Sequence, residues 1–126
     1  MYNVINEAES AMATFIYDQL GNPVAFIEGE FVHSILGQAI GQIRDTHIHK
    51  ISGEYVGELY ESMVVDMNIG DLGNIGHQGD PGNPGFKGIP GNRGVIDTEY
   101  TDVFFKLIER VNYIDESIKN FSYRLI

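Results

Sequence analysis

The chain has 126 residues, of which 18 are acidic and 8 basic, and its formal net charge is −10 at pH 7. This charge argues against binding to nucleic acid phosphates or to an anionic membrane surface. The chain contains no cysteine, so neither disulfides nor thiolate metal sites are expected. No stretch reaches the length of about 18 apolar residues that a membrane span needs, and residues 1–15 lack the basic start of a secretory signal.

Residues 1–14 are predicted to form an N-terminal arm. Val4, Ala8 and Met12 follow at four-residue spacing, which is mildly helical. A segment of this length does not form a domain by itself, and two interpretations remain open: a frayed terminus, or a peptide that docks on a larger assembly.

Residues 15–69 contain a sequence repeat with a period of 16 residues. It is marked by glycines and by β-branched residues at fixed positions: Gly21, Gly37, Gly53 and Ile16, Val32, Ile48, Val64. Each unit has two short β-like runs, such as 24–28 and 31–34, separated by turn residues such as Gly29 or Asp45. The repeat predicts a meander of six to eight short antiparallel strands. One copy has few large core side chains, so we expect three copies to share a core.

Residues 70–96 are nine consecutive Gly-X-Y triplets. Glycine occupies every third position without exception: Gly70, Gly73, Gly76, Gly79, Gly82, Gly85, Gly88, Gly91 and Gly94. Strict glycine at this spacing is typical of the collagen triple helix, where no Cβ fits at the shared axis of three chains. The segment therefore predicts a collagen-like rod and a homotrimer, with these glycines as trimerisation residues.

Two other interpretations of the glycines are weaker. A flexible linker has no reason to keep a strict phase, and a phosphate-binding loop would require a GK[ST] or GxGxxG context that is absent. In the triple-helix interpretation Phe86 and Ile89 occupy X positions and would lie exposed on the outside of the rod.

Residues 97–126 carry apolar side chains in an unbroken alternation of three and four. The positions are Phe104, Leu107, Val111, Ile114, Ile118, Phe121 and Leu125. This heptad pattern predicts a C-terminal trimeric coiled-coil helix in which these seven residues form the seam. An amphipathic helix packed on the β domain is the alternative.

The sequence gives little support for an enzyme, a cofactor or a metal. No cysteine is present and no Ser, His and Asp combination stands in a recognisable turn. His47 and His49 are two apart and would face one side of a strand, so three chains could bring six imidazoles to an axis. Because His33 and His49 occupy equivalent repeat positions, an aromatic packing role is the preferred interpretation, and we predict no metal site.

A β-repeat region, a Gly-X-Y rod and a terminal coiled coil together resemble the architecture of bacteriophage fibres and related virion appendages. The resemblance implies a structural, adhesive protein of a virion, attached to a capsid or tail protein of the same particle and contacting a host-surface glycan or protein. The alternatives are a bacterial surface stalk protein and a soluble glycan- or peptide-binding module, for which Tyr17, Phe31, Tyr55 and Tyr60 could supply an aromatic platform.

Overall fold

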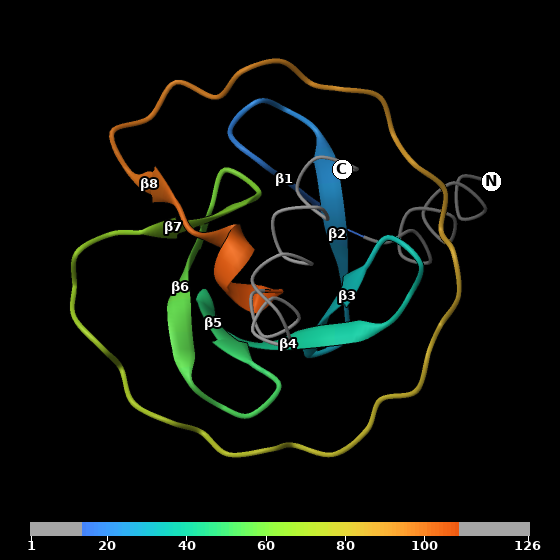
Figure 1. Ribbon diagram of the computed structural model, residues 1–126, viewed down its shortest axis with the longest axis vertical. Helices are drawn as coiled ribbons and strands as arrows, with labels where there is room; N and C mark the ends of the chain where they lie inside the picture. The colour runs from blue at the N-terminus through green and yellow to red at the C-terminus, as the bar shows by residue number, and fades with distance from the viewer. Residues whose placement is uncertain (1–13, 109–126) are drawn as a thin grey trace, which may run out of the picture.

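The structure is a computed structural model and describes residues 14–108, which form one antiparallel sheet of eight strands (Figure 1). The strands are β1 (Thr14–Tyr17), β2 (Pro23–Glu28), β3 (Phe31–Ser34), β4 (Ala39–Arg44), β5 (His47–Lys50), β6 (Tyr55–Tyr60), β7 (Met63–Asp66) and β8 (Thr101–Asp102). Each strand pairs with the next one in the chain. The predicted antiparallel meander is therefore confirmed, and the runs at 24–28 and 31–34 correspond to β2 and β3.

Tight turns join the strands of successive repeats. Residues 29–30, 45–46 and 61–62 connect β2 to β3, β4 to β5 and β6 to β7. The first residue of each turn has a positive φ, which is 65° at Gly29, 56° at Asp45 and 53° at Glu61. Gly29 and Asp45 stand where the sequence predicts turns, because glycine and aspartate tolerate this left-handed region better than most residues do.

The meander curls until its two edges approach each other. The carbonyl group of Glu30 accepts a hydrogen bond from an N–H of β4, and that of Thr46 accepts one from an N–H of β6. Their counterpart, the carbonyl group of Ser62, accepts from the N–H of Tyr17 in β1 at 2.8 Å. The N–H of Gln19 donates to Asp102 Oδ2 at 2.9 Å. The first and last parts of the described chain are thus brought together.

The core lies inside this curl and belongs to a single chain. Its buried apolar residues are Ile16, Ala25, Val32, Ile40, Ile48, Val56, Val64, Val103, Phe104 and Leu107. The β-branched residues of the repeat, at 16, 32, 48 and 64, are all completely buried. The expectation that three copies must share a core is wrong, because the four repeats of one chain supply the facing residues for one another.

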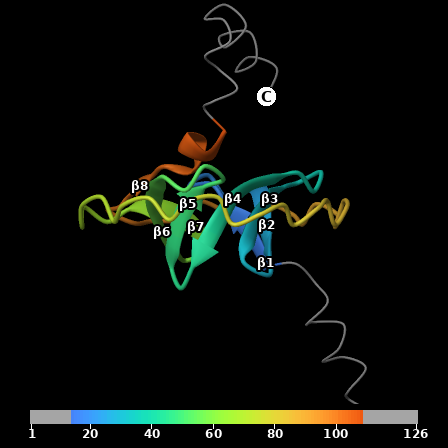
Figure 2. The same cartoon turned by 90° about the horizontal axis from the view of Figure 1, so that it is seen from below.

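Residues 67–100, here called the outer loop, contain all of the Gly-X-Y triplets and encircle the meander (Figure 1). Seen from the side, the outer loop runs around the middle of the meander (Figure 2). The prediction of a collagen-like triple helix is therefore wrong. The trimer contacts assigned to Gly70, Gly73, Gly76, Gly79, Gly82, Gly85, Gly88, Gly91 and Gly94 depended on that helix, and a single chain does not test them.

The periodic glycines serve backbone conformation in the outer loop. Eight of the nine have φ between 77° and 99°, and Gly91 is the exception. A Cβ added at any of the nine would meet nothing within 4 Å. Crowding at an axis is thus not the reason for glycine here. Residues that carry a side chain rarely adopt a positive φ of this size, so glycine is favoured at eight positions for its conformational freedom.

The residue after each glycine explains the regular spacing. At six triplets its side chain accepts a hydrogen bond from the N–H of the next glycine, two residues on, at 2.6–3.0 Å. These acceptors are Asp71, Asn74, His77, Asp80, Asn83 and Asn92. Asparagine and aspartate commonly bond their own backbone in this way, which forms an Asx-turn. Six of the nine triplets of the outer loop are therefore closed by a turn of this kind.

The predicted trimeric coiled coil of residues 97–126 is also wrong in the described part. Residues 97–100 complete the outer loop, β8 follows, and the 3-10 helix η1 occupies Phe104–Leu107. Phe104 and Leu107 are buried in the core of the same chain, which agrees better with the packed amphipathic alternative. The remaining seam residues lie outside the described residues: Val111, Ile114, Ile118, Phe121 and Leu125. Residues 14–108 contain no helix long and apolar enough to cross a membrane.

Candidate binding clefts beneath the outer loop

The outer loop rests on three turns of the meander that are 16 residues apart. Each turn has a buried glycine with positive φ, namely Gly21, Gly37 and Gly53. A Cβ on any of them would come within 3 Å of backbone atoms of the outer loop. These three residues, called the docking glycines below, therefore allow the loop to approach the meander closely.

The loop contacts the docking glycines through three segments that are nine residues apart: Asn74–Gly76, Asn83–Gly85 and Asn92–Gly94. At the outer two, the N–H of Ile75 donates to Gly53 O and that of Arg93 to Gly21 O, both at 3.0 Å. The central segment has Pro84, which carries no N–H. The carbonyl group of Gly37 is bonded to His33 Nδ1 at 3.0 Å, as that of Gly53 is to His49 Nδ1 at 2.8 Å in addition to the loop N–H.

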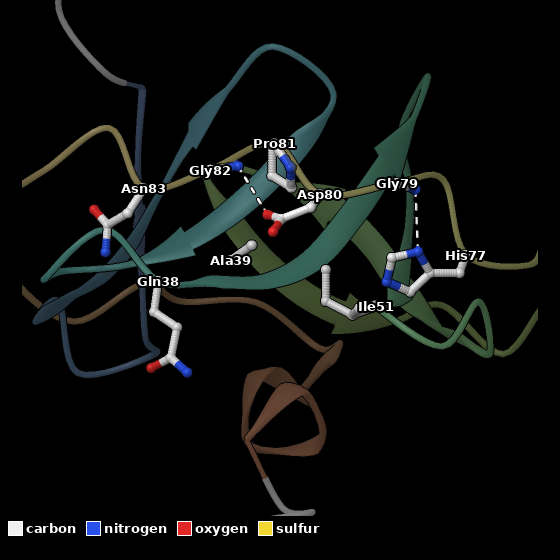
Figure 3. Close-up of a pocket in the computed structure, with 9 residues that line it drawn as sticks. All are labelled: Gln38, Ala39, Ile51, His77, Gly79, Asp80, Pro81, Gly82 and Asn83. Atoms are coloured by element: carbon white, nitrogen blue, oxygen red, sulfur yellow. Dashed lines mark hydrogen bonds between the residues drawn. The ribbon is translucent and has the colours of Figure 1, made fainter.

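A shallow cleft of about 480 Å³ lies between the outer loop and two of these turns (Figure 3). Its lining residues are Gln38, Ala39, Ile51, His77, Gly79, Asp80, Pro81, Gly82 and Asn83. His77 and Asp80 face the cleft from the loop, but one acceptor of each already takes a glycine N–H, at 3.0 and 2.9 Å. In neutral His77 the proton therefore resides on Nε2, which leaves that atom as a hydrogen-bond donor.

A second cleft of about 550 Å³ shares His77 and Ile51 with the first one and extends toward η1. Its other lining residues are Ile40, Lys50, Ser52, Glu54, Lys106 and Leu107. Gln42 holds the loop beside both clefts, because its Nε2 lies within hydrogen-bond distance of Gly76 O, at 3.0 Å, and of the carbonyl groups of Lys50 and Ile51, at 3.1 Å. The position of the loop over the clefts is thus set by buried polar contacts.

A separate polar cluster surrounds the buried carboxylate of Glu58 on β6. Its oxygens accept hydrogen bonds from Tyr55 Oη at 2.6 Å and Thr46 Oγ1 at 2.8 Å, and His47 Nδ1 lies 2.9 Å away. Burial alone would raise the pKa of Glu58, but the hydrogen bonds outweigh it and hold the pKa below its usual range. Burial, followed by the bond to Glu58, raises the pKa of Tyr55. The cluster joins β5 to β6.

The two histidines of the HxH motif serve different contacts. His47 pairs with Glu58, whereas His49 Nδ1 lies 2.8 Å from the docking-glycine carbonyl of Gly53. His49 also packs edge-on against Tyr55, and the equivalent His33 stacks on Phe26. The aromatic packing role is confirmed for both. Within residues 14–108 no group of three or more His, Asp or Glu side chains is arranged to hold a metal ion.

The aromatic residues considered as a glycan platform are held by separate contacts within the fold. Arg93 lies 4.4 Å above the ring of Tyr17, and Tyr60 packs edge-on against Tyr100 at 5.1 Å. Tyr55 belongs to the Glu58 cluster. Phe31 is half-buried on β3. These contacts do not assemble the four rings into one platform.

The eight strands form four similar two-stranded units around the centre of the curled meander. The units are β1–β2, β3–β4, β5–β6 and β7–β8. In the first three units the short turn closes with the same pair of backbone hydrogen bonds, which begin at Asp18, Ser34 and Lys50. The fourth unit carries the outer loop in place of a short turn. The model of the 4-fold beta flower protein family matches residues 14–99, most of the chain.

The chain belongs to the 4-fold beta flower family. The match covers the β-repeat region and the glycine triplets as one unit, in place of the separate β-repeat domain and rod on which the resemblance to fibres was based. Searches of curated proteins and of solved structures found no match.

Sequence reasoning missed the docking glycines and the clefts of the beta flower. A signal was present in the 16-residue spacing of glycine in the meander and the nine-residue spacing of asparagine in the outer loop, at Asn74, Asn83 and Asn92. The sequence alone offers no reason to combine two different periods, because they meet only when the loop runs around the meander.

Proposed function

We propose that the protein is a structural, non-enzymatic component of a virion that attaches to a partner protein through an apolar surface on its outer loop. The observation behind the proposal is the exposure of Leu36, Phe86 and Ile89, at 73%, 57% and 65%. Leu36 adjoins the docking glycine that touches Gly85, so it lies at the same contact as Phe86. Apolar side chains gathered on a surface in this way commonly mark a protein contact.

This apolar surface is held in place by the beta flower. Lys87, between Phe86 and Ile89, has its Nζ 3.3 Å from Glu28 Oε1 of β2. The loop therefore presents the two side chains from a segment attached to the sheet, which limits the entropy lost on binding. Exposed phenyl and aliphatic groups bury more favourably against protein than against the polar surface of a glycan. A capsid or tail protein is thus the proposed partner, with a host-surface glycan as the alternative.

The proposal does not include a fibre, because the predicted triple helix is wrong and the predicted coiled coil is wrong in its described part. A homotrimer stays a prediction, and light scattering tests it against the monomer mass of 14.1 kDa. A mass near three times this value would support a trimer. The mass of one chain would refute it without affecting the attachment proposal.

The attachment proposal is tested by replacing both Phe86 and Ile89 with serine. The matched control replaces Leu20 and Val95 with serine. These two residues are also exposed and adjoin a different docking glycine. We expect quantitative mass spectrometry of purified particles to detect the wild type and the control, and at least about ten-fold less of the Phe86/Ile89 variant, since burial of each large apolar side chain contributes about 1.5–3 kcal/mol.

Two results would refute the proposal. One is that the protein is abundant in the producing cell but absent from the particles. If it is then recovered in the cell envelope, the bacterial surface alternative is favoured. The other is equal incorporation of both double variants. If the wild type and both double variants bind a glycan with the same affinity, the glycan contact lies on a face other than that of Phe86 and Ile89.

A further inference from the structure

Two side chains of the outer loop reach the cleft of about 480 Å³ with part of their hydrogen-bonding capacity unused. Asp80 Oδ1 accepts the N–H of Gly82, and His77 Nδ1 accepts that of Gly79. Within residues 14–108, Asp80 Oδ2 and His77 Nε2 make no hydrogen bond or ion pair. The two turns thus orient one free acceptor and one free donor, since the proton of neutral His77 resides on Nε2.

An apolar area lies beside these two polar groups. Ala39 begins β4 and Ile51 follows β5, and both residues are half-buried. The carboxylate of Asp80 and the ring of His77 extend toward this part of the meander from the loop (Figure 3). The ring of Pro81 lies next to the carboxylate (Figure 3). The cleft therefore combines a small apolar area with one acceptor and one donor.

The charge of the cleft restricts the class of ligand. Among its described lining residues Asp80 alone is charged when His77 is neutral, and none is a lysine or an arginine. Residues 14–108 as a whole carry 13 acidic and 5 basic side chains. An anion is therefore repelled by the cleft and by its surroundings. A simple ammonium ion would satisfy the carboxylate but leave the N–H of His77 without an acceptor.

A hydroxyl group meets both requirements, because it can donate one hydrogen bond and accept two. We propose that the cleft binds an uncharged pyranose sugar. One hydroxyl donates to Asp80 Oδ2 and another accepts from His77 Nε2–H, while the C–H groups of the sugar ring lie on Ala39, Ile51 and Pro81. The bond to the carboxylate is charge-assisted and is the stronger of the two. The cleft volume of about 480 Å³ falls within the range of about 300–1,000 Å³ that is usual for small-ligand sites.

The sugar site is separate from the attachment surface. It includes none of Leu36, Phe86 and Ile89, and sugar binding does not depend on incorporation into a virion. In a virion protein, a host-surface glycan would bind at this cleft while the apolar surface contacts the capsid or tail protein. The two proposals fail independently, because one is tested on the purified chain and the other on purified particles.

The first test is a titration of the ¹⁵N-labelled full chain, followed by NMR. The probes are the methyl α-glycosides of glucose, galactose and mannose, with cyclohexanol and n-butylammonium as comparisons. At least one glycoside should cause saturable shifts of the Gly79 and Gly82 amides. Cyclohexanol has a six-membered ring but a single hydroxyl, so it should bind at least about three-fold more weakly than the best glycoside.

Three results of this titration would overturn the proposal. The first is that none of the glycosides causes a saturable shift. The second is that cyclohexanol binds as tightly as the best glycoside, which would make the cleft an apolar hollow. The third is that n-butylammonium binds more tightly than every glycoside, which would make Asp80 part of a cation site.

The second test compares two aspartates that make the same kind of turn. Asp80→Asn keeps an acceptor for the N–H of Gly82 but removes the charge, so it should weaken binding of the best glycoside by about ten-fold. Asp71→Asn makes the same change in a turn outside the cleft and should alter affinity less than about two-fold. Equal weakening by both variants would indicate an effect of overall charge and overturn the site.

The third test removes the donor. His77→Asn keeps an acceptor for the N–H of Gly79, as asparagine does at position 74, but its shorter amide no longer reaches the position of Nε2. It should weaken binding at least about three-fold. The variant with serine at positions 86 and 89 should bind the glycoside like the wild type. Full affinity of His77→Asn, or loss of binding in the serine variant, would place the sugar elsewhere and overturn the proposal.

Discussion

Replacing Gly88 with alanine tests why glycine recurs in the outer loop. Gly88 has φ of 91°, and an added Cβ would meet nothing within 4 Å. Any cost of the substitution therefore arises from backbone strain and not from a clash. A non-glycine residue held in a sparsely populated region costs about 1–3 kcal/mol. For a domain of this size, each 1 kcal/mol lowers Tm by about 4–8 °C.

Gly91, one triplet further along, is a matched control. It also has open space around its Cα, but its φ does not lie in the positive region. Alanine at a compatible position reduces the freedom of the unfolded chain and stabilises a protein by about 0.4–1 kcal/mol. We therefore expect Gly91→Ala to be neutral or slightly stabilising, whereas Gly88→Ala is destabilising. A triple helix would instead tolerate neither substitution.

Urea unfolding and amide hydrogen exchange together measure both effects. The loop can relieve strain by leaving the meander, so the loss in global stability cannot exceed the free energy of loop docking. Faster exchange of the Ile75 and Arg93 amides, which bond the docking glycines, would reveal such detachment. D-Alanine at position 88, introduced by chemical ligation, should restore stability because its mirror-image backbone favours positive φ. Equal stability and exchange for the two L-alanine variants would refute this explanation of the glycines.

Further predictions concern the contacts that fix the beta flower. Gly37→Ala combines positive φ with a Cβ less than 3 Å from loop atoms, so it should cost at least about 2 kcal/mol more in urea unfolding than Gly29→Ala, where the space is open. The pKa of Glu58 is lowered by folding, so its carboxylate stabilises the fold above the usual value of 4.5 and this contribution is lost as pH falls through the folded pKa. Glu58→Gln should therefore cost about 1–3 kcal/mol at pH 7, with a difference from wild type that shrinks below about pH 4.5 in urea unfolding. Asn92→Asp keeps the acceptor of the turn but loses two donated hydrogen bonds, so a thermal melt should show a lower Tm than for Asp80→Asn, which keeps the acceptor of its own turn.

The meander could be predicted from sequence because its signals are local. Turn residues such as Gly29 and Asp45 fall where the φ is positive, and β-branched residues recur at the positions that become the core. The period of 16 residues even places His33 and His49 in equivalent contacts. What the period does not reveal is closure, because the bond from Tyr17 to Ser62 joins two residues that no local pattern connects.

The outer loop could not be predicted because two structures need the same glycine spacing for different reasons. A triple helix excludes the Cβ at its axis, whereas this loop requires positive φ at nearly every glycine. The sequence feature that separates them is the residue that follows glycine. Asp71, Asn74 and Asp80 can each bond the next glycine N–H, and a triple helix has no use for such a bond.

The segment that follows the loop was misinterpreted for a related reason, since three-and-four spacing does not identify the partner that buries the apolar stripe. Phe104 and Leu107 satisfy the first two heptad positions but are buried by the meander of their own chain.

The place of the loop in the fold also accounts for where ligands could bind. Three units have short turns that leave the sides of the meander open. In the fourth unit the two strands are joined by the long outer loop, which covers those sides. Hollows are left between the places where the loop contacts the docking glycines. Two of them share His77, which the nine-residue spacing places directly after the Gly76 contact. The equivalent residues at the other two contacts are Phe86 and Val95, which are exposed and apolar. The same contact between loop and meander is thus followed by an imidazole ring at one place and by an apolar side chain at the other two. Different sides of the beta flower can therefore bind different ligands while the core stays the same.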